Sequence, residues 1–147
     1  AWFSREIQQG NLKKEYLAVV HGCPEADSGE LNDLLLHDVR KNKSYVVNRM
    51  RGGVKKARLS YAVLEKQPDR TLVQVRLFTG RTHQIRVQFA SRKLPLIGDG
   101  RYGGGSGELA LWSVRLTFRY HGKELCFTEK PDSLGGLTEF PELLTME

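Results

Sequence analysis

One run near the middle of the chain ends an apolar segment and leads into an arginine on a predicted helix: Leu77-Phe78-Thr79-Gly80-Arg81-Thr82-His83-Gln84-Ile85-Arg86. On a helical wheel, Phe89 and Ala90 follow Arg86 on the same face, so its guanidinium cannot point freely into water. Burying a charge without a partner is costly. We therefore expect an anion beside Arg86, which could be a carboxylate, a phosphate, or each in turn.

The neighbours of Arg86 are also chemically versatile, namely Arg81, Thr82, His83 and Gln84. They lie where a strand is expected to meet a helix, and free backbone N–H groups and the helix dipole favour an anion there. The alternative is that Arg86 only closes a buried ion pair that stabilises the fold.

Tyr16 opens a short apolar segment in Lys14-Glu15-Tyr16-Leu17-Ala18. Taken alone, such a residue is typical of a core or edge tyrosine. Beside a nucleic-acid surface, the same ring could stack on an extruded base.

The basic residues are unevenly distributed. The chain of 147 residues has a formal net charge of +6, yet the segment from Arg40 to Leu64 contains eight basic residues and no Asp or Glu. The rest of the chain therefore carries a formal net charge of −2. Such a block can neutralise phosphates, which indicates RNA or DNA as a partner, although a solvated basic loop is the alternative. The candidate backbone contacts are Lys41, Lys43, Arg49, Arg51, Lys55, Lys56 and Arg58.

Alternating and periodic patterns predict the elements that position these residues. A helix is expected from about Thr82 to Arg92, with Thr82 as its N-cap and Pro95 preventing much continuation. Strands are expected over 15–20, at Tyr45-Val46-Val47 as an edge strand, and over 57–66 and 73–77 as a hairpin. Residues 29–37 fit either a short helix or a strand. A closing hairpin is expected over 109–120 and 124–128, after a glycine-rich connector over 96–107.

A short helix is also expected over 2–10, and an acidic tail over 133–147. Strands outnumber helices, so the pattern predicts an α+β fold with a mainly antiparallel mixed sheet and few helices. The domain division is 1–132 for the folded unit and 133–147 for the tail.

Several chemistries are not supported by the sequence. His21, Cys23, His121 and Cys126 do not have the spacing of a zinc site, and two cysteines are too few for a disulfide framework. The glycine-rich segment lacks the ending of a P-loop, and there is no nucleophile elbow. No apolar run reaches the roughly 18 residues of a membrane span, and no signal peptide is evident, so we expect a cytoplasmic protein.

The segment from Leu77 to Val87 resembles, nearly letter for letter, the signature motif of the RluA-type RNA pseudouridine synthases. The segment from Lys14 to Gly22 resembles the tyrosine motif of that family, and that from Leu96 to Gly104 resembles the loop after its signature helix. The likeness extends from Phe3 to about Asp132. It implies a partial pseudouridine synthase catalytic-domain fold, RNA as the partner, no metal, and isomerisation of uridine to pseudouridine without a cofactor.

The resemblance also implies roles for individual residues. Tyr16 matches the active-site tyrosine that stacks on the base, and Arg86 matches the arginine that pairs with the catalytic aspartate. Ile85 would wall the base pocket, and the preceding residues would shape the site and touch RNA: Arg81, Thr82, His83 and Gln84.

The nucleophilic aspartate of the family lies in a His-Arg-Leu-Asp motif upstream of the tyrosine motif, and these 147 residues do not contain it. We therefore expect a C-terminal portion of a synthase that is inactive alone, acts when complete on structured RNA (ribosomal rather than transfer RNA), and could self-associate through exposed apolar surface. The alternative function is a non-catalytic RNA-binding module.

Overall fold

A computed structural model describes residues 12–120 and 122–128 of the chain. The expected helix over 2–10 and the tail over 133–147 lie outside these residues. The described part consists of seven strands, one α-helix and one short 3-10 helix. Their bounds are β1 Leu12–His21, β2 Ser28–Asp38, β3 Lys43–Val47, β4 Val54–Lys66, β5 Arg70–Leu77, α2 Gln84–Ala90, η1 Gly100–Tyr102, β6 Leu111–Tyr120 and β7 Lys123–Thr128.

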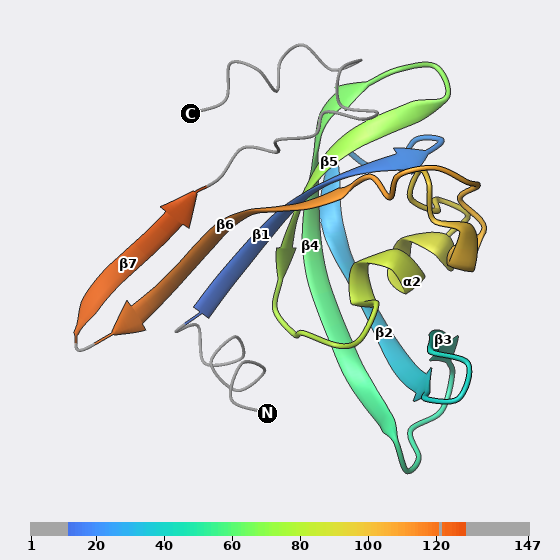
Figure 1. Cartoon of the computed structure of the whole chain (residues 1–147), viewed down its shortest axis with the longest axis horizontal. Helices are drawn as coiled ribbons and strands as arrows, with labels where there is room; N and C mark the ends of the chain where they lie inside the picture. The colour runs from blue at the N-terminus through green and yellow to red at the C-terminus, as the bar shows by residue number, and fades with distance from the viewer. Residues whose placement is uncertain (1–11, 121, 129–147) are drawn as a thin grey trace.

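The strands form one twisted sheet in the order β3-β2-β4-β5-β1-β6-β7, and α2 lies against one of its faces (Figure 1). Every strand pair in the described part of the chain is antiparallel. The α+β class is therefore confirmed. The ambiguous segment over 29–37 is a strand, β2, and β3 is an edge strand as predicted.

The alternation of apolar residues decides which face of the sheet each side chain occupies. On β4 and β5, the residues of the predicted hairpin pair directly, with Tyr61 opposite Val75 and Leu59 opposite Leu77. These residues pack beneath α2, whose Phe89 is fully buried, as part of one core cluster. Complete burial of such a side chain stabilises the fold by about 1.5–3 kcal/mol.

Strand β1 is apolar on both faces because it lies in the interior of the sheet. Tyr16, Ala18 and Val20 belong to the α2 side, whereas Leu17 and Val19 contribute to a second cluster on the opposite side. β1 pairs with β5 on one edge and β6 on the other, and its register with β6 shifts between Glu15 and Tyr16. A central strand buried on both faces gives Tyr16 a fixed position.

The helix differs from its prediction at both ends. It begins at Gln84, and the N-cap is His83, whose φ of 56° is left-handed, with no side-chain capping hydrogen bond. Thr82 is exposed and is not the cap. The turn before the helix is instead held by Gln84, whose side chain accepts the Arg81 N–H at 2.9 Å and whose backbone N–H donates to the Arg81 carbonyl at 3.1 Å. The helix ends at Ala90, two residues before Arg92.

The glycine-rich segment is a closely packed loop and not a simple connector. A Cβ on Gly104 would lie 1.8 Å from the Leu96 carbonyl oxygen, and one on Gly98 would lie 2.0 Å from the Glu108 carbonyl oxygen. Gly98 also has a φ of +79°, which favours glycine. These contacts let the loop return close to its own start and bury Asp99, which is 1% exposed.

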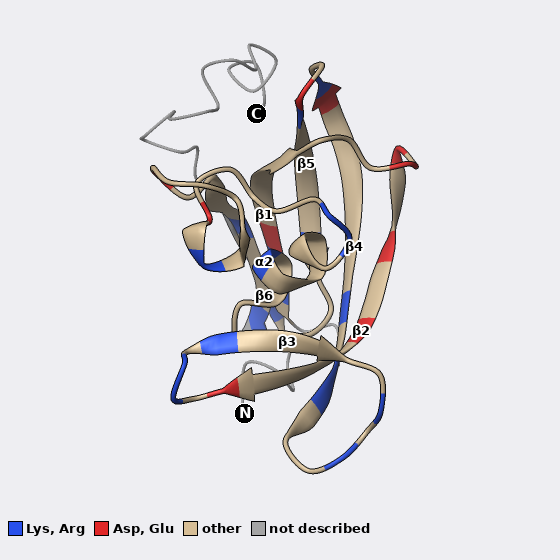
Figure 2. Cartoon of the chain, turned by 90° about the vertical axis from the view of Figure 1, so that its right-hand side faces the viewer, with Lys and Arg blue, Asp and Glu red and all other residues tan. Residues whose placement is uncertain are grey.

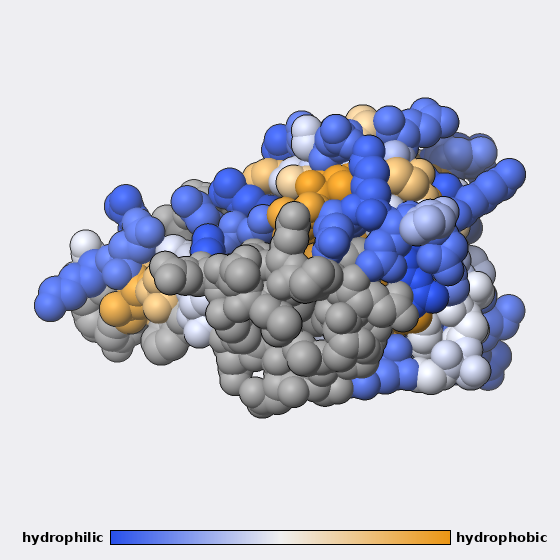
Figure 3. Space-filling view, turned by 90° about the horizontal axis from the view of Figure 1, so that it is seen from above, coloured by the Kyte–Doolittle hydropathy of each residue, from blue (hydrophilic) through white to orange (hydrophobic). Residues whose placement is uncertain are grey.

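The surface is mixed in character. Seen from above, hydrophilic side chains predominate and apolar ones gather in a smaller patch (Figure 3). Three large apolar residues of the described part are exposed, namely Val39, Val46 and Met50. Neither described helix has the length and apolar composition needed to cross a bilayer.

Replacing Gly104 by alanine should destabilise the protein by about 2 kcal/mol or more, because backbone atoms of Leu96 must move to accept the methyl group. The matched control is Gly52→Ala, where nothing lies within 4 Å of the added Cβ. Urea unfolding of the two variants measures the difference. Equal unfolding midpoints would contradict the close packing of this loop.

Candidate active site

A cavity of about 270 Å³ lies on the α2 side of the sheet, where β1, β5 and the start of α2 meet. Six of its nine lining residues were singled out from the sequence, and the other three are leucines. The lining consists of Tyr16, Leu77, Arg81, His83, Gln84, Ile85, Arg86, Leu109 and Leu111. Three segments that are far apart in the sequence, at Tyr16, over 77–86 and over 109–111, therefore enclose one hollow. Thr82 does not line it.

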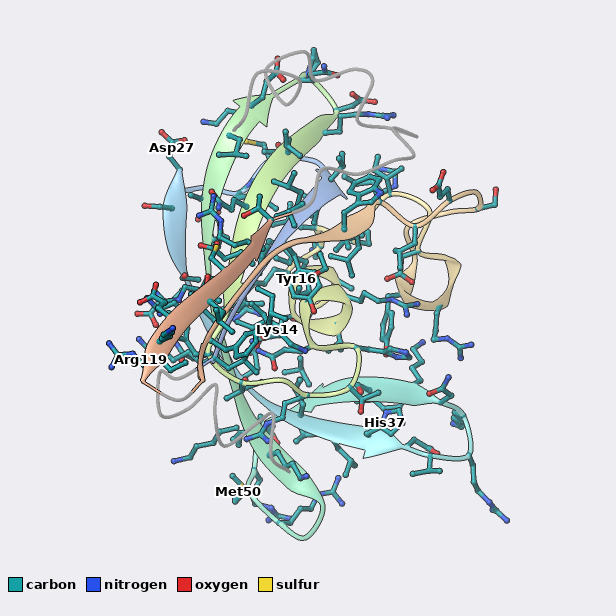
Figure 4. All side chains as sticks on the ribbon, turned by 60° about the vertical axis from the view of Figure 1, so that its left-hand side comes forward. Lys14, Tyr16, Asp27, His37, Met50 and Arg119 are labelled. Atoms are coloured by element: carbon teal, nitrogen blue, oxygen red, sulfur yellow. The ribbon has the colours of Figure 1, made fainter. Side chains whose placement is uncertain are left out.

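Tyr16 forms one wall of this cavity. β1 holds it between Val75 on β5 and Ser113 on β6, and Figure 4 shows it on the side of the sheet that carries α2. Burial raises the pKa of Tyr16, so the phenol stays protonated well beyond neutral pH. A fixed, neutral aromatic ring with a polar tip is thus available to a ligand.

Arg86 also lines the cavity and has an anionic partner within the chain. Its Nε donates to Asp99 Oδ2 at 2.8 Å and its Nη2 donates to Asp99 Oδ1 at 2.9 Å. The anion expected beside Arg86 is therefore a carboxylate of the chain itself, and the ion pair that the sequence left as an alternative forms. The partner is thirteen residues further on, in the glycine-rich loop, and the fold of that loop brings it back to α2.

The environment of this pair is largely closed to water. The Asp99 side chain is fully buried and that of Arg86 is 20% exposed. The hydrogen bonds to Asp99 raise the pKa of Arg86. The guanidinium carbon also lies 5.2 Å from the centre of the Tyr102 ring. Arg86 is therefore a permanent, oriented cation at the edge of the cavity.

Gln84 fixes the turn that leads into α2. Its Oε1 accepts hydrogen bonds from Thr79 Oγ1 at 2.8 Å and from the Arg81 N–H, and its Nε2 donates to the Arg58 carbonyl at 3.1 Å. The Arg81 Nε in turn donates to the Lys56 carbonyl at 2.8 Å. The buried Gln84 thus links the cavity wall to β4.

His83 connects the cavity to the edge strand β3 through Tyr102. The Tyr102 hydroxyl lies 2.8 Å from His83 Nδ1 and accepts the Ser44 N–H, also at 2.8 Å. Burial, followed by the nearby Arg86 cation, lowers the pKa of His83, so the neutral ring is favoured. The sequence analysis did not identify Tyr102 or Ser44. Only the resemblance of the loop to the family pattern could have indicated Tyr102.

The basic block spreads over β3, the β3–β4 turn and β4 (Figure 2). Most of its side chains are exposed, and Lys43 is half-buried with its Nζ over the rings of Tyr45 and Tyr102. The exposed members are Arg40, Lys41, Arg49, Arg51, Lys55, Lys56 and Arg58. Arg58 differs from the others because it forms an ion pair with Glu30 and lies over the Phe78 ring.

A larger groove of about 650 Å³ lies beside β2 and β4. Neither Tyr16 nor Arg86 borders it, and its Arg58 is already paired. Within the described residues, no group of three or more His, Cys, Asp or Glu side chains could hold a metal ion. The 270 Å³ cavity is therefore the site at which the chemically distinctive residues converge.

The chain is similar in sequence to proteins of one known family. The family model described as RNA pseudouridylate synthase matches residues 1–91. The chain is 34% identical over 151 residues to ribosomal large subunit pseudouridine synthase D of Nitrosomonas europaea, covering 92% of this chain and 43% of that protein. It is 36% identical over 130 residues to an uncharacterized RNA pseudouridine synthase of Zymomonas mobilis, covering 86% of this chain and 57% of that protein.

The fold is also similar to solved structures. Human RNA pseudouridylate synthase domain containing 1 superposes with a TM-score of 0.72 at 19% identity, covering 97% of this chain and 69% of that one. Human RNA pseudouridylate synthase domain containing 4 gives the same TM-score of 0.72 at 19% identity, and the match covers 97% of this chain and 66% of that protein. The chain thus spans about half the length of the curated relatives it matches. On the family match and these identities, the chain belongs to the RluA-type RNA pseudouridine synthase family.

Proposed function

We propose that the cavity between Tyr16 and Arg86 receives a uridine flipped out of structured RNA and that the complete protein isomerises it to pseudouridine. The observation that carries this proposal is the convergence of Tyr16 with the motif residues Arg81, His83 and Arg86 around one hollow. Ribosomal RNA is the proposed substrate class, supported by the names of the curated relatives. The proposed setting is the cytoplasm.

The chemistry divides between residues that hold the base and residues that hold charge. The Tyr16 ring offers a stacking surface, and the leucine side chains that border the cavity exclude water from it. The Arg86 cation would keep a nearby nucleophilic carboxylate ionised, since an opposite charge at about 4–6 Å favours the charged form. By resemblance, that carboxylate comes from an aspartate that these 147 residues do not contain.

An isomerisation of this kind consumes no co-reactant. The bond between the sugar and the base nitrogen breaks, the base turns, and a bond from the sugar to a base carbon forms; that carbon loses its hydrogen as a proton, and the freed nitrogen takes up a proton. The protein therefore has to bind, orient and shield the base, and to stabilise the reacting carboxylate. Ile85 and Gln84 would shape the pocket. The exposed basic residues of β4 and of the turns on either side of β3 would hold the RNA backbone.

We expect the 147-residue chain to release no tritium from RNA labelled at the uridine carbon that forms the new bond. The same chain extended by an upstream segment carrying His-Arg-Leu-Asp should release it over many turnovers. In the extended protein, Arg86→Ala should lower turnover by about 100-fold, because the carboxylate no longer has its counter-charge, and should weaken RNA binding far less. Multiple turnovers by the unextended chain would overturn the assignment of the missing nucleophile.

Lysines of the basic block should contribute to the affinity for RNA. Lys55→Ala or Lys56→Ala should weaken RNA binding across many sequences and reduce the slope of log K against log salt by roughly 0.7–0.9 for each phosphate that is no longer neutralised. The control is Lys66→Ala, because Lys66 lies at the far end of the same strand and pairs with Asp27. Nitrocellulose filter binding over a salt series gives both quantities. An equal loss of affinity in all three variants would contradict a localised RNA surface.

These two experiments also separate the enzyme from a non-catalytic RNA-binding module. A module would keep its RNA affinity in Tyr16→Phe and Arg86→Ala variants and would remain inactive after the upstream extension. Restored turnover favours the enzyme.

A further inference from the structure

Asp99 binds Arg86 through one edge of the guanidinium only. The two bonds come from Nε and Nη2. A guanidinium has five N–H donors, so three remain, two of them on Nη1. Nη1 makes no hydrogen bond to Asp99. Because Arg86 also lines the cavity, its second edge is available to a group bound there.

We propose that Asp99 is a positioning residue for the reaction: it fixes the plane of the Arg86 guanidinium so that the opposite edge meets the reacting carboxylate. Arg86 is then shared by two carboxylates, one structural and one reactive. This inference rests on the proposed function, because it deepens the role of the same cavity.

The surroundings of Asp99 are built to keep it in place. Its side chain is fully buried. Its backbone N–H donates to the Leu96 carbonyl at 3.1 Å, and its carbonyl accepts the Gly104 N–H at 2.7 Å and the Tyr102 N–H at 3.2 Å. The loop that carries Asp99 closes only because glycine occupies position 104. Because the Asp99 carboxylate is held in place, it fixes the orientation of the Arg86 guanidinium that it binds.

A bidentate ion pair that only stabilised the fold would not need to lie beside the cavity, as the Arg86–Asp99 pair does. The chain contains another partly buried pair, in which Arg92 binds both carboxylate oxygens of Asp33, at 2.7 and 3.2 Å. Neither residue borders the cavity. That pair is therefore a matched control for a purely structural role.

The test is the pH dependence of turnover in the extended protein that contains the upstream aspartate. Asp99→Asn keeps the shape of the side chain but removes its charge and one acceptor oxygen. If Arg86 then turns away, the reacting carboxylate no longer has its counter-charge and its pKa rises. The acid limb of the kcat profile should move to higher pH by about one unit, since a close opposite charge depresses a carboxyl pKa by about 1–3 units. The kcat at neutral pH should fall by about 10–100-fold with KM nearly unchanged.

The charged and titratable groups around the guanidinium come from several elements. They are Asp99 and Tyr102 on the loop and η1, His83 and Arg81 before α2, and Tyr16 on β1, with His37 on β2 and Arg101 on η1 acting on His83. Of these, only Asp99 is a carboxylate. If Arg86 stayed in place, removal of the Asp99 charge would move the acid limb to lower pH. The direction of the shift therefore distinguishes loss of position from loss of charge.

The control variant Asp33→Asn should leave the acid limb where it is. An unchanged or lowered limb in Asp99→Asn, or an equal upward shift in both variants, would overturn the proposal.

A second measurement does not depend on activity. In the ¹⁵N spectrum of the 147-residue chain, the Arg86 Nε–H, assigned by its disappearance in Arg86→Lys, should exchange slowly with solvent. Rapid exchange would overturn the proposal at its starting point. If the extended wild-type protein forms no pseudouridine while the Nε–H is protected, the proposed function fails and the reaction role of Asp99 fails with it, leaving a structural ion pair.

Discussion

The bidentate pair between Arg86 and Asp99 is the interaction on which the site depends. It joins α2 to the glycine-rich loop and places a cation at the edge of the cavity. Burying Asp99 fully is tolerable only because a guanidinium satisfies both of its oxygens. The same pair places the Tyr102 ring against Arg86, and Tyr102 in turn contacts His83 and Ser44. One ion pair thus orders three parts of the chain around one hollow.

The sheet and the helix contribute different things to this arrangement. The sheet is rigid and provides the Tyr16 wall, because β1 is paired on both edges and apolar on both faces. The turn before α2 provides the polar residues, and Gln84 anchors that turn to β4. The exposed basic residues lie on β4 and on the turns on either side of β3, and none of them borders the cavity (Figure 2). In the proposed function, recognition of the RNA backbone and handling of the base belong to two different surfaces, and Tyr102 contacts residues of both.

Much of this fold could be predicted from the sequence because strand periodicity is a local signal. Leu59, Tyr61 and Val63 alternate with polar residues, and the hairpin of β4 and β5 follows from them. The signature run could likewise be placed at a strand-to-helix junction. The segment over 29–37 could not be assigned, because Leu34, Leu35 and Leu36 are apolar without a clear period; the pairing with both β3 and β4 decides it.

The partner of Arg86 was missed for a physical reason. Asp99 is thirteen residues away in a segment whose composition indicates a connector, and only the tight approach of Gly104 to Leu96 turns it back toward α2. The helix start was missed because the turn before α2 is held by the Gln84 side chain, which donates to the Arg58 carbonyl on β4, and no side-chain cap forms. Both errors concern contacts between segments, which local patterns do not encode.

A double-mutant cycle on Arg86 and Asp99 tests the central claim most directly. Urea unfolding of the wild-type chain, Arg86→Met, Asp99→Asn and the double variant gives the coupling free energy between the two side chains. The account predicts that each single change costs about 3 kcal/mol or more, because it leaves a buried charge unpaired, and that the double change costs much less than the two together. Additive costs, with a coupling below about 0.5 kcal/mol, would contradict it.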